Sequence, residues 1–117
     1  MTPDLGDILH LAFDPASGRE MKGDHYCLVV TPKAFNQHFG LVWTLPITTG
    51  AQTIARGLTA VTLMGTGLKV SGNVLCHQIK ALDWTARQAC KVDRLKGPVL
   101  DEILEICTGI LDPARRA

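Results

Sequence analysis

Histidine, basic, acidic and hydroxyl side chains gather in three polar stretches of this 117-residue chain. An imidazole titrates near pH ~6.5, so one histidine can take a proton from an attacking oxygen while another gives a proton to a leaving oxygen. Cationic and hydroxyl groups can hold a phosphate while negative charge develops on it. The stretches supply Arg19, Glu20, Lys22, Asp24 and His25, then Thr48, Thr49, Gln52 and Arg56, then His77, Gln78, Lys80, Asp83 and Arg87. These residue types suffice for metal-free cleavage of a phosphodiester.

RNA suits this chemistry because its own 2′-OH is a nucleophile, so the protein needs none. The sequence has no Walker loop and no G-x-G-x-x-G, H-E-x-x-H or G-x-S-x-G motif, and we expect neither a metal nor a cofactor. The same residues also occur on ordinary surfaces, where histidines bond to neighbours and threonines favour strands. Spacing alone leaves a cluster of His25, Thr48 and His77 and an ordinary surface as alternatives.

The polar residues fall at the ends of expected strands and in the loops beyond them. Apolar runs predict strands at residues 6–13, 26–31, 41–48, 58–63, 72–78 and 86–92, a short helical turn at 33–39, and polar loops at 16–24 and 50–57. Pro46 lies inside the third strand and predicts an edge or a bulge there, because proline has no N–H to donate.

A helix near the C-terminus is the clearest element. Pro98 suits its first turn, and Pro113 ends it. Apolar residues recur at positions 100, 103, 104, 107, 110 and 111, which is one helical stripe. We expect the stripe to pack on the sheet, and a second copy or a partner could share it. Short strands followed by one helix predict an α+β fold: a small, strongly bent antiparallel β-sheet or barrel with a C-terminal α-helix.

Length and charge narrow the classes of function further. A chain of 117 residues with net charge +1 is expected to form one domain, residues 1–117. Residues 1–97 carry ten Lys and Arg against seven Asp and Glu, and residues 98–117 carry two against four. A polyanion would therefore bind the body of the chain. With no bilayer-length apolar run and an acidic start unlike a signal peptide, we expect a cytoplasmic protein whose four cysteines are buried, reduced thiols.

Several short motifs follow one another along the chain. Gly6-Asp7-Ile8 precedes Asp14-Pro15-Ala16-Ser17-Gly18, Leu28-Val29-Val30-Thr31-Pro32, Ala34-Phe35-Asn36, Pro46-Ile47-Thr48-Thr49-Gly50, Ala55-Arg56, the run from Val74 to Gln78, and Leu82-Asp83-Trp84. In this order they resemble the MazF/PemK (Kid) family of type II toxin–antitoxin endoribonucleases, PemK above all. The resemblance covers residues 6–111.

The resemblance implies an SH3-like barrel with a C-terminal helix, assembled as a homodimer whose groove holds single-stranded RNA. It implies metal-independent, sequence-preferring cleavage of mRNA, which leaves a 2′,3′-cyclic phosphate and a 5′-OH and inhibits translation and growth. It also implies a cognate PemI/MazE-like antitoxin, whose flexible acidic segment occupies the same groove. The mildly basic body of the chain fits both ligands.

The sequence departs from the family at the site itself. The family's His-Glu pair in the first loop is Arg19 and Glu20 here, and its Arg-Pro pair before the second strand begins with His25. The arginine and aspartate of the PemK fifth strand become Leu75 and His77. Two imidazoles thus stand where an acid–base pair is needed.

We therefore expect His77 to be the base, with His25 or Arg19 protonating the 5′-oxygen or holding the phosphate, which Thr48 and Thr49 bind. The residues assigned to catalysis are His77, His25, Thr48, Arg19 and Glu20, and those assigned to RNA binding are Thr49, Gln78, Arg56, Lys22 and Arg87. Three alternatives stay open: an RNA binder with weak or no cleavage, a CcdB-like inhibitor of DNA gyrase on the same barrel, and a plain SH3-like interaction module.

Overall fold

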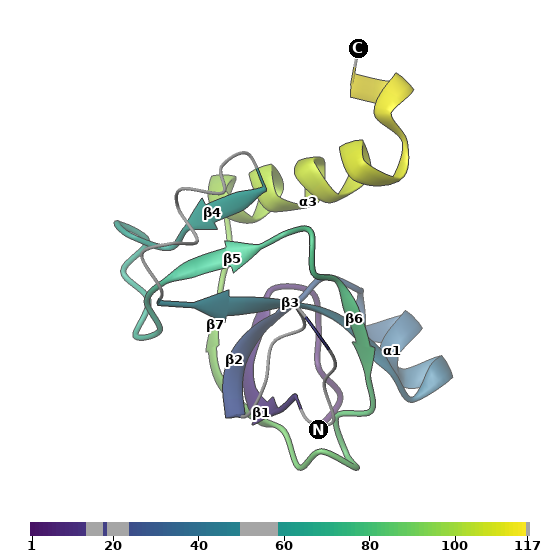
Figure 1. Ribbon diagram of the computed structural model, residues 1–117. Helices are drawn as coiled ribbons and strands as arrows, with labels where there is room; N and C mark the ends of the chain where they lie inside the picture. The colour runs from purple at the N-terminus through teal and green to yellow at the C-terminus, as the bar shows by residue number, and fades with distance from the viewer. Residues whose placement is uncertain (14–17, 19–23, 50–58, 117) are drawn as a thin grey trace.

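The computed structural model describes residues 1–13, 18, 24–49 and 59–116. The elements run in the order β1 (Asp7–Ala12), β2 (Asp24–Val29), α1 (Lys33–Phe39), β3 (Val42–Thr48), β4 (Ala60–Thr62), β5 (Asn73–Leu75), β6 (Lys80–Leu82), β7 (Cys90–Arg94), α3 (Pro98–Leu111) and the 3₁₀ helix η1 (Pro113–Arg116) (Figure 1). Among these described elements, no helix has the length and apolarity needed to cross a membrane.

The strands form one antiparallel sheet in the order β4-β5-β3-β2-β1-β7, and β6 pairs with β3 as well. Figure 1 shows β1, β2 and β3 curving strongly, with α3 lying across the β4–β5 end of the sheet. The predicted α+β fold, a bent antiparallel sheet with a C-terminal helix, is confirmed. Within the described chain, β4 and β7 lie at the two ends of this strand order and do not pair with each other, so the sheet is bent like a barrel without being closed.

Both faces of the sheet are buried. Ile8 belongs to a core cluster that includes Ile103 of α3, whereas the next residue, Leu9, belongs to a second cluster with Val42 and Leu82. Successive side chains of a strand point to opposite faces, so each face needs its own cover. Helix α3 covers the first face, and Trp84 packs on the second.

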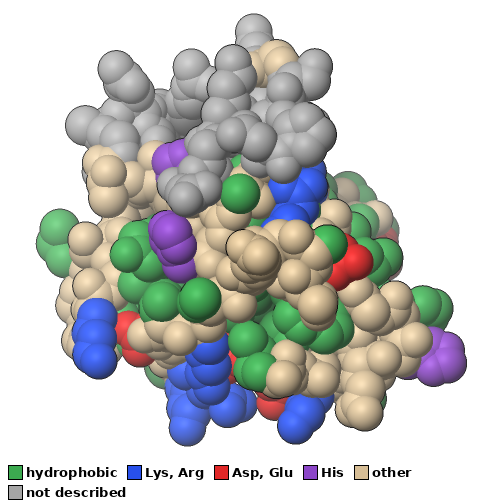
Figure 2. Space-filling view, turned by 90° about the horizontal axis from the view of Figure 1, so that it is seen from below, with side chains coloured by type: hydrophobic (Ala, Val, Ile, Leu, Met, Phe, Trp, Pro, Cys, Tyr) green, Lys and Arg blue, Asp and Glu red, His purple; other side chains and the backbone are tan. Residues whose placement is uncertain are grey.

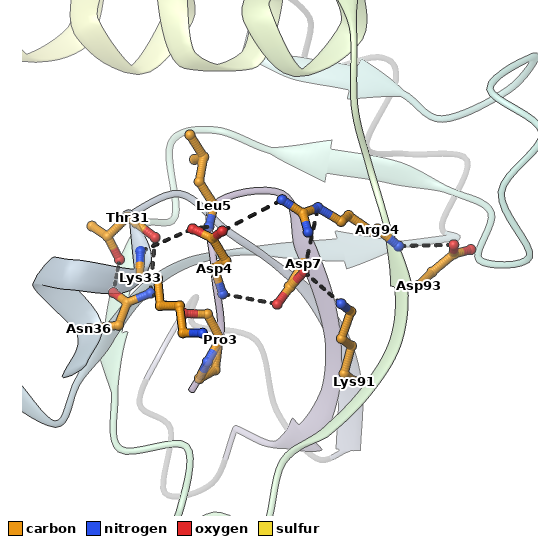
Figure 3. Close-up of polar contacts among 10 residues, drawn as sticks. All are labelled: Pro3, Asp4, Leu5, Asp7, Thr31, Lys33, Asn36, Lys91, Asp93 and Arg94. Carbon is orange, nitrogen blue, oxygen red and sulfur yellow. Dashed lines mark hydrogen bonds and ion pairs between the residues drawn. The ribbon is translucent and has the colours of Figure 1, made fainter. Parts of the chain in front are cut away.

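A polar network ties the N-terminus to α1 and β7 (Figure 3). The Asn36 amide nitrogen donates to the carbonyl oxygens of Pro3 and Thr31, both at 2.9 Å, and its side chain is fully buried. The Asp4 backbone N–H donates to the Asp7 carboxylate at 2.9 Å. That carboxylate lies 3.2 Å from the Lys91 ammonium, and the Arg94 guanidinium lies 3.5 Å from Asp4. We call these residues (Asp4, Asp7, Thr31, Asn36, Lys91 and Arg94) the N-terminal network.

The strand predicted at residues 86–92 begins too early: only residues 90–92 of it lie in a strand. The strands here are β6 at Lys80–Leu82, which had not been foreseen, and β7 at Cys90–Arg94. Asp83 explains the shift, because its carboxylate accepts the backbone N–H groups of Thr85 and Ala86 and turns the chain. Such local bonds compete with extended structure.

Pro46 does not mark an edge. It pairs with Cys27 inside the sheet, with β2 on one side of β3. On the other side β6 pairs with Val42–Thr44 and β5 pairs with Ile47 and Thr48. Pro46 lies in the gap between these two partners, where a missing N–H breaks no ladder bond.

Two expectations about buried residues are only partly met. Cys27 and Cys76 are buried, but Cys107 is half-buried and Cys90 is exposed. The α3 stripe packs on the sheet through Ile103 and neighbouring apolar side chains, whereas Ile110 and Leu111 at its end are 49% and 74% exposed. The last turn of α3 therefore projects beyond the sheet (Figure 1).

Candidate active site

Strand register brings the middle of the predicted site together. Tyr26 pairs with Ile47, and Thr48 pairs with Asn73, so His25, Thr48 and Asn73 lie at the same end of three adjacent strands. His25, Thr48 and Thr49 line an open pocket of about 290 Å³ at this end. The Phe13 ring lies edge-on to the His25 ring, with centroids 6.2 Å apart. We call this hollow the strand-end pocket.

Sequence reasoning missed one wall of the strand-end pocket. Lys69, Val70 and Ser71, from the segment between β4 and β5, line it as well. Thr49 and Ser71 also border a neighbouring hollow over β4 and β5, so the two depressions adjoin. The Gly65, Gly67 and Gly72 cluster was the available signal, since glycines bracket a segment that makes sharp turns.

Two contacts fix this wall against the strands. Gly72 has a φ of +124°, and a Cβ there would lie 2.5 Å from the Thr48 carbonyl oxygen, so the two backbones approach closely. The Asp93 carboxylate accepts the Lys69 backbone N–H at 2.8 Å and the Arg94 backbone N–H at 2.9 Å. The hydrogen bonds from Arg94 and Lys69 lower the pKa of Asp93, because they stabilise its ionised form.

His77 lies at the other end of β5. Its Nδ1 is 3.0 Å from the Thr59 hydroxyl oxygen, and the Gln78 side-chain nitrogen is 3.5 Å from its Nε2. His77 is four positions along the chain from Asn73 and lies in the turn after β5, because the strand predicted at residues 72–78 ends at Leu75, whose carbonyl oxygen accepts the Gln78 backbone N–H. His77 is not among the described residues that line the strand-end pocket. The structure thus places His25 on β2, beside the Asn73 end of β5, and His77 in the turn that follows the other end of β5.

The remaining predicted residues divide into two groups. Arg87 donates from its guanidinium to the Ala12 carbonyl oxygen at 2.8 Å, so it holds the end of β1. Arg19, Glu20, Lys22 and Arg56 lie outside the described residues. Within the described ranges, no group of three His, Cys, Asp or Glu side chains is arranged to hold a metal ion.

Basic side chains do not form one patch on the face shown in Figure 2. Histidine side chains and a basic group border the grey residues there, another histidine lies at the right edge, and the other visible Lys and Arg side chains lie along the lower edge. A cation that serves the strand-end pocket therefore has to be identified individually, from the residues that line it.

Comparison with known proteins gives one consistent family. The family model described as "PemK-like, MazF-like toxin of type II toxin-antitoxin system" matches residues 4–109. The Escherichia coli endoribonuclease PemK is 33% identical over 106 residues, which cover 91% of this chain and 80% of PemK. The E. coli K12 endoribonuclease toxin MazF is 32% identical over 89% of this chain and 86% of its own length.

Solved structures give the same result. The crystal structure of MazF from Deinococcus radiodurans matches with a TM-score of 0.84 and 34% identity, covering 95% of this chain and 97% of that one. MazF in a MazE–MazF crystal structure from the same organism matches with a TM-score of 0.79 and 32% identity, over 95% and 97% of the two chains. The chain therefore belongs to the PemK-like, MazF-like toxin family of type II toxin–antitoxin systems.

Proposed function

We propose that this protein is an endoribonuclease toxin that cleaves single-stranded mRNA without a metal and so inhibits translation and growth. The observation that carries the proposal is the strand-end pocket, where His25, Thr48 and Thr49 meet in a chain 33% identical to an endoribonuclease. The relatives named above are endoribonucleases, which favours RNA cleavage over the gyrase-inhibitor alternative.

In the proposed reaction a base takes the proton of the 2′-OH, and the 2′-oxygen then bonds to phosphorus. The bond from phosphorus to the 5′-oxygen breaks, and an acid protonates that oxygen. The products are a 2′,3′-cyclic phosphate and a 5′-OH. The Thr48 and Thr49 hydroxyls donate to the phosphate oxygens, and His25 serves as the acid beside them.

His77 stays the proposed base. For that role its Nδ1–H must donate to the Thr59 hydroxyl oxygen, 3.0 Å away, so that Nε2 carries no hydrogen and accepts the proton of the 2′-OH in place of the contact with the Gln78 side-chain nitrogen at 3.5 Å. Arg19 and Glu20 stay proposed as supporting groups of the first loop. His77 lies in the turn beyond the end of β5 that is opposite the pocket, and it is not among the described residues that line the pocket with His25.

We further propose a cytoplasmic homodimer with a PemI/MazE-like antitoxin. The D. radiodurans MazF, 32% identical to this chain, is solved together with MazE, which supports an antitoxin partner. The exposed Ile110 and Leu111 at the end of α3 offer apolar surface that a second chain can cover. A dimer groove would give several nucleotides more room than one pocket of about 290 Å³.

The test is incubation of purified protein with a long single-stranded RNA, with and without EDTA, over a range of pH. We expect cleavage in EDTA that leaves 2′,3′-cyclic phosphate ends. His25→Ala should slow it about 10²-fold or more. His38→Ala is the matched control, because His38 is exposed on α1, away from the pocket.

Two results would overturn the proposal. One is that folded wild-type protein does not cleave the RNA. The other is that the His25→Ala variant cleaves RNA as fast as the His38→Ala variant. The same protein is also tested for inhibition of DNA supercoiling by gyrase. Inhibition of gyrase without RNA cleavage would support the alternative, and neither activity would indicate a plain interaction module.

A further inference from the structure

The strand-end pocket has a basic side chain in addition to its histidine and hydroxyl groups. Lys69 lines it together with His25, Thr48, Thr49 and Ser71. Among the described lining residues, Lys69 is the only lysine or arginine. Hydroxyls and a histidine alone give a phosphate little charge compensation, and charge-assisted bonds are about twice as strong as neutral ones.

The contacts of Lys69 leave its ammonium for a ligand. Asp93 is the nearby acid, but its carboxylate accepts the backbone N–H of Lys69, at 2.8 Å, and that of Arg94. Ion pairs closer than 4.0 Å join Lys91 and Arg94 to Asp4 and Asp7, and within the described part of the chain none involves Lys69. Asp93 thus fixes where the lysine backbone lies; the Lys69 charge also helps to lower the pKa of this carboxyl, but the two charged groups do not approach within 4.0 Å.

Two other basic groups of the described chain show what a structural partner looks like. Arg87 donates to the Ala12 carbonyl oxygen, and Lys91 pairs with the Asp7 carboxylate. Lys69 instead stands on the wall that Gly72 holds against Thr48. Its position combines a fixed backbone, an exposed side chain and a neighbouring histidine.

We propose that Lys69 binds a non-bridging oxygen of the RNA phosphate that occupies the strand-end pocket, beside the Thr48 and Thr49 hydroxyls. This inference rests on the proposed function and names a further substrate-binding residue for it. A lysine here acts as a point charge on the phosphate, so arginine should replace it better than any neutral side chain.

The experiment measures binding of an RNA segment that the wild-type protein cleaves, made uncleavable by 2′-O-methyl groups, over a range of salt concentrations. Lys69→Met should weaken binding roughly tenfold or more at low salt. It should also flatten the slope of log affinity against log salt by about 0.7, the value for one phosphate contact on a single strand. The Lys69→Arg variant should keep most of the wild-type affinity and most of the wild-type salt slope.

Lys33→Met is the matched control, since Lys33 is an exposed lysine on α1 and should leave affinity and slope unchanged. As a second measurement, the ammonium signal of Lys69 in the unmodified protein should shift when the oligonucleotide is added. A wild-type protein that neither binds nor cleaves RNA would refute the proposed function. A wild-type protein that cleaves, while Lys69→Met keeps the wild-type affinity and salt slope, would overturn this inference alone.

Discussion

The N-terminal network and the strand-end pocket use similar side chains in opposite ways. In the network, Lys91 and Arg94 face the carboxylates of Asp7 and Asp4, and the buried amide of Asn36 has its hydrogen bonds satisfied inside the protein. In the pocket, the side chains of His25 and Lys69 border an open hollow. Acid, base and amide are joined to one another in the first region, whereas the histidine and lysine of the second region face the hollow.

The difference shows how a small sheet separates stability from binding. Buried polar groups stabilise a fold only when their partners are present, so the network must be complete. Phosphate-binding groups must instead be held by their backbones, which leaves their side chains for the ligand. Gly72 against Thr48 and Asp93 on the Lys69 backbone provide that support here.

The largest expected effect separates the two regions by stability. Asn36→Ala removes two donated hydrogen bonds and leaves the carbonyl groups of Pro3 and Thr31 without this partner. We expect the free energy of unfolding to fall by about 2–4 kcal/mol, measured by urea denaturation. RNA cleavage by the folded fraction should stay unchanged. Gln37→Ala, at the next and exposed position of α1, is the control and should alter stability little.

A second change should act on the pocket. Gly72→Ala places a Cβ 2.5 Å from the Thr48 carbonyl oxygen at a φ of +124°. We expect a loss of about 1–3 kcal/mol of stability and a clear loss of cleavage, because Thr48 or Ser71 must move.

The Gly67→Ala variant separates the effect of a positive φ from the effect of the close approach to Thr48. Gly67 also has a positive φ, of +79°, but nothing lies within 4 Å of its Cβ position. The Gly67→Ala variant should therefore have a lower free energy of unfolding but cleave RNA at the wild-type rate. Equal loss of cleavage in the two variants would mean that the close approach to Thr48 does not shape the pocket.

A smaller effect is expected at Arg87, whose guanidinium bonds to the Ala12 carbonyl oxygen. Arg87→Ala should lower the free energy of unfolding by about 1 kcal/mol, measured by thermal and urea unfolding. The salt dependence of RNA binding should stay as in the wild type. Unchanged stability together with a flatter salt dependence would instead support the RNA-binding role predicted from the sequence, and would make Arg87 a partner of Lys69.

The smallest effect concerns pH. Backbone hydrogen bonds, from Arg94 first and then Lys69, lower the pKa of Asp93 in the folded protein. Its contribution to stability is therefore present above the unfolded value of about 3.9 and is lost as pH falls through the folded value. The Lys69 amide signal in NMR should move in this acid range in the wild type and stay constant in Asp93→Asn. An amide that titrates identically in both would show that Asp93 does not hold the pocket wall.

Local sequence patterns predicted several elements closely. Pro32 and Gly40 bound the short helix, and Gly40 ends it in the left-handed conformation, with φ of 70°. The apolar stripe places Ile103 in the core, although it does not show that Ile110 lies beyond the sheet. The strand predicted from residue 86 begins only at Cys90. The Asp83 carboxylate accepts hydrogen bonds from the backbone N–H groups that follow it, and the resulting turn outweighs the apolar pattern.

The sequence by itself determined the helices, most strands and the residue types fit for phosphate chemistry, since these follow from periodicity and from individual side chains. It also placed His25, Thr48 and Thr49 at strand ends. Only the tertiary structure decided which strand ends meet. Strand register joins His25 to Thr48, puts His77 at the far end of β5, and brings in Lys69 from the segment before β5. Register depends on pairing between distant parts of the chain, which no local pattern contains.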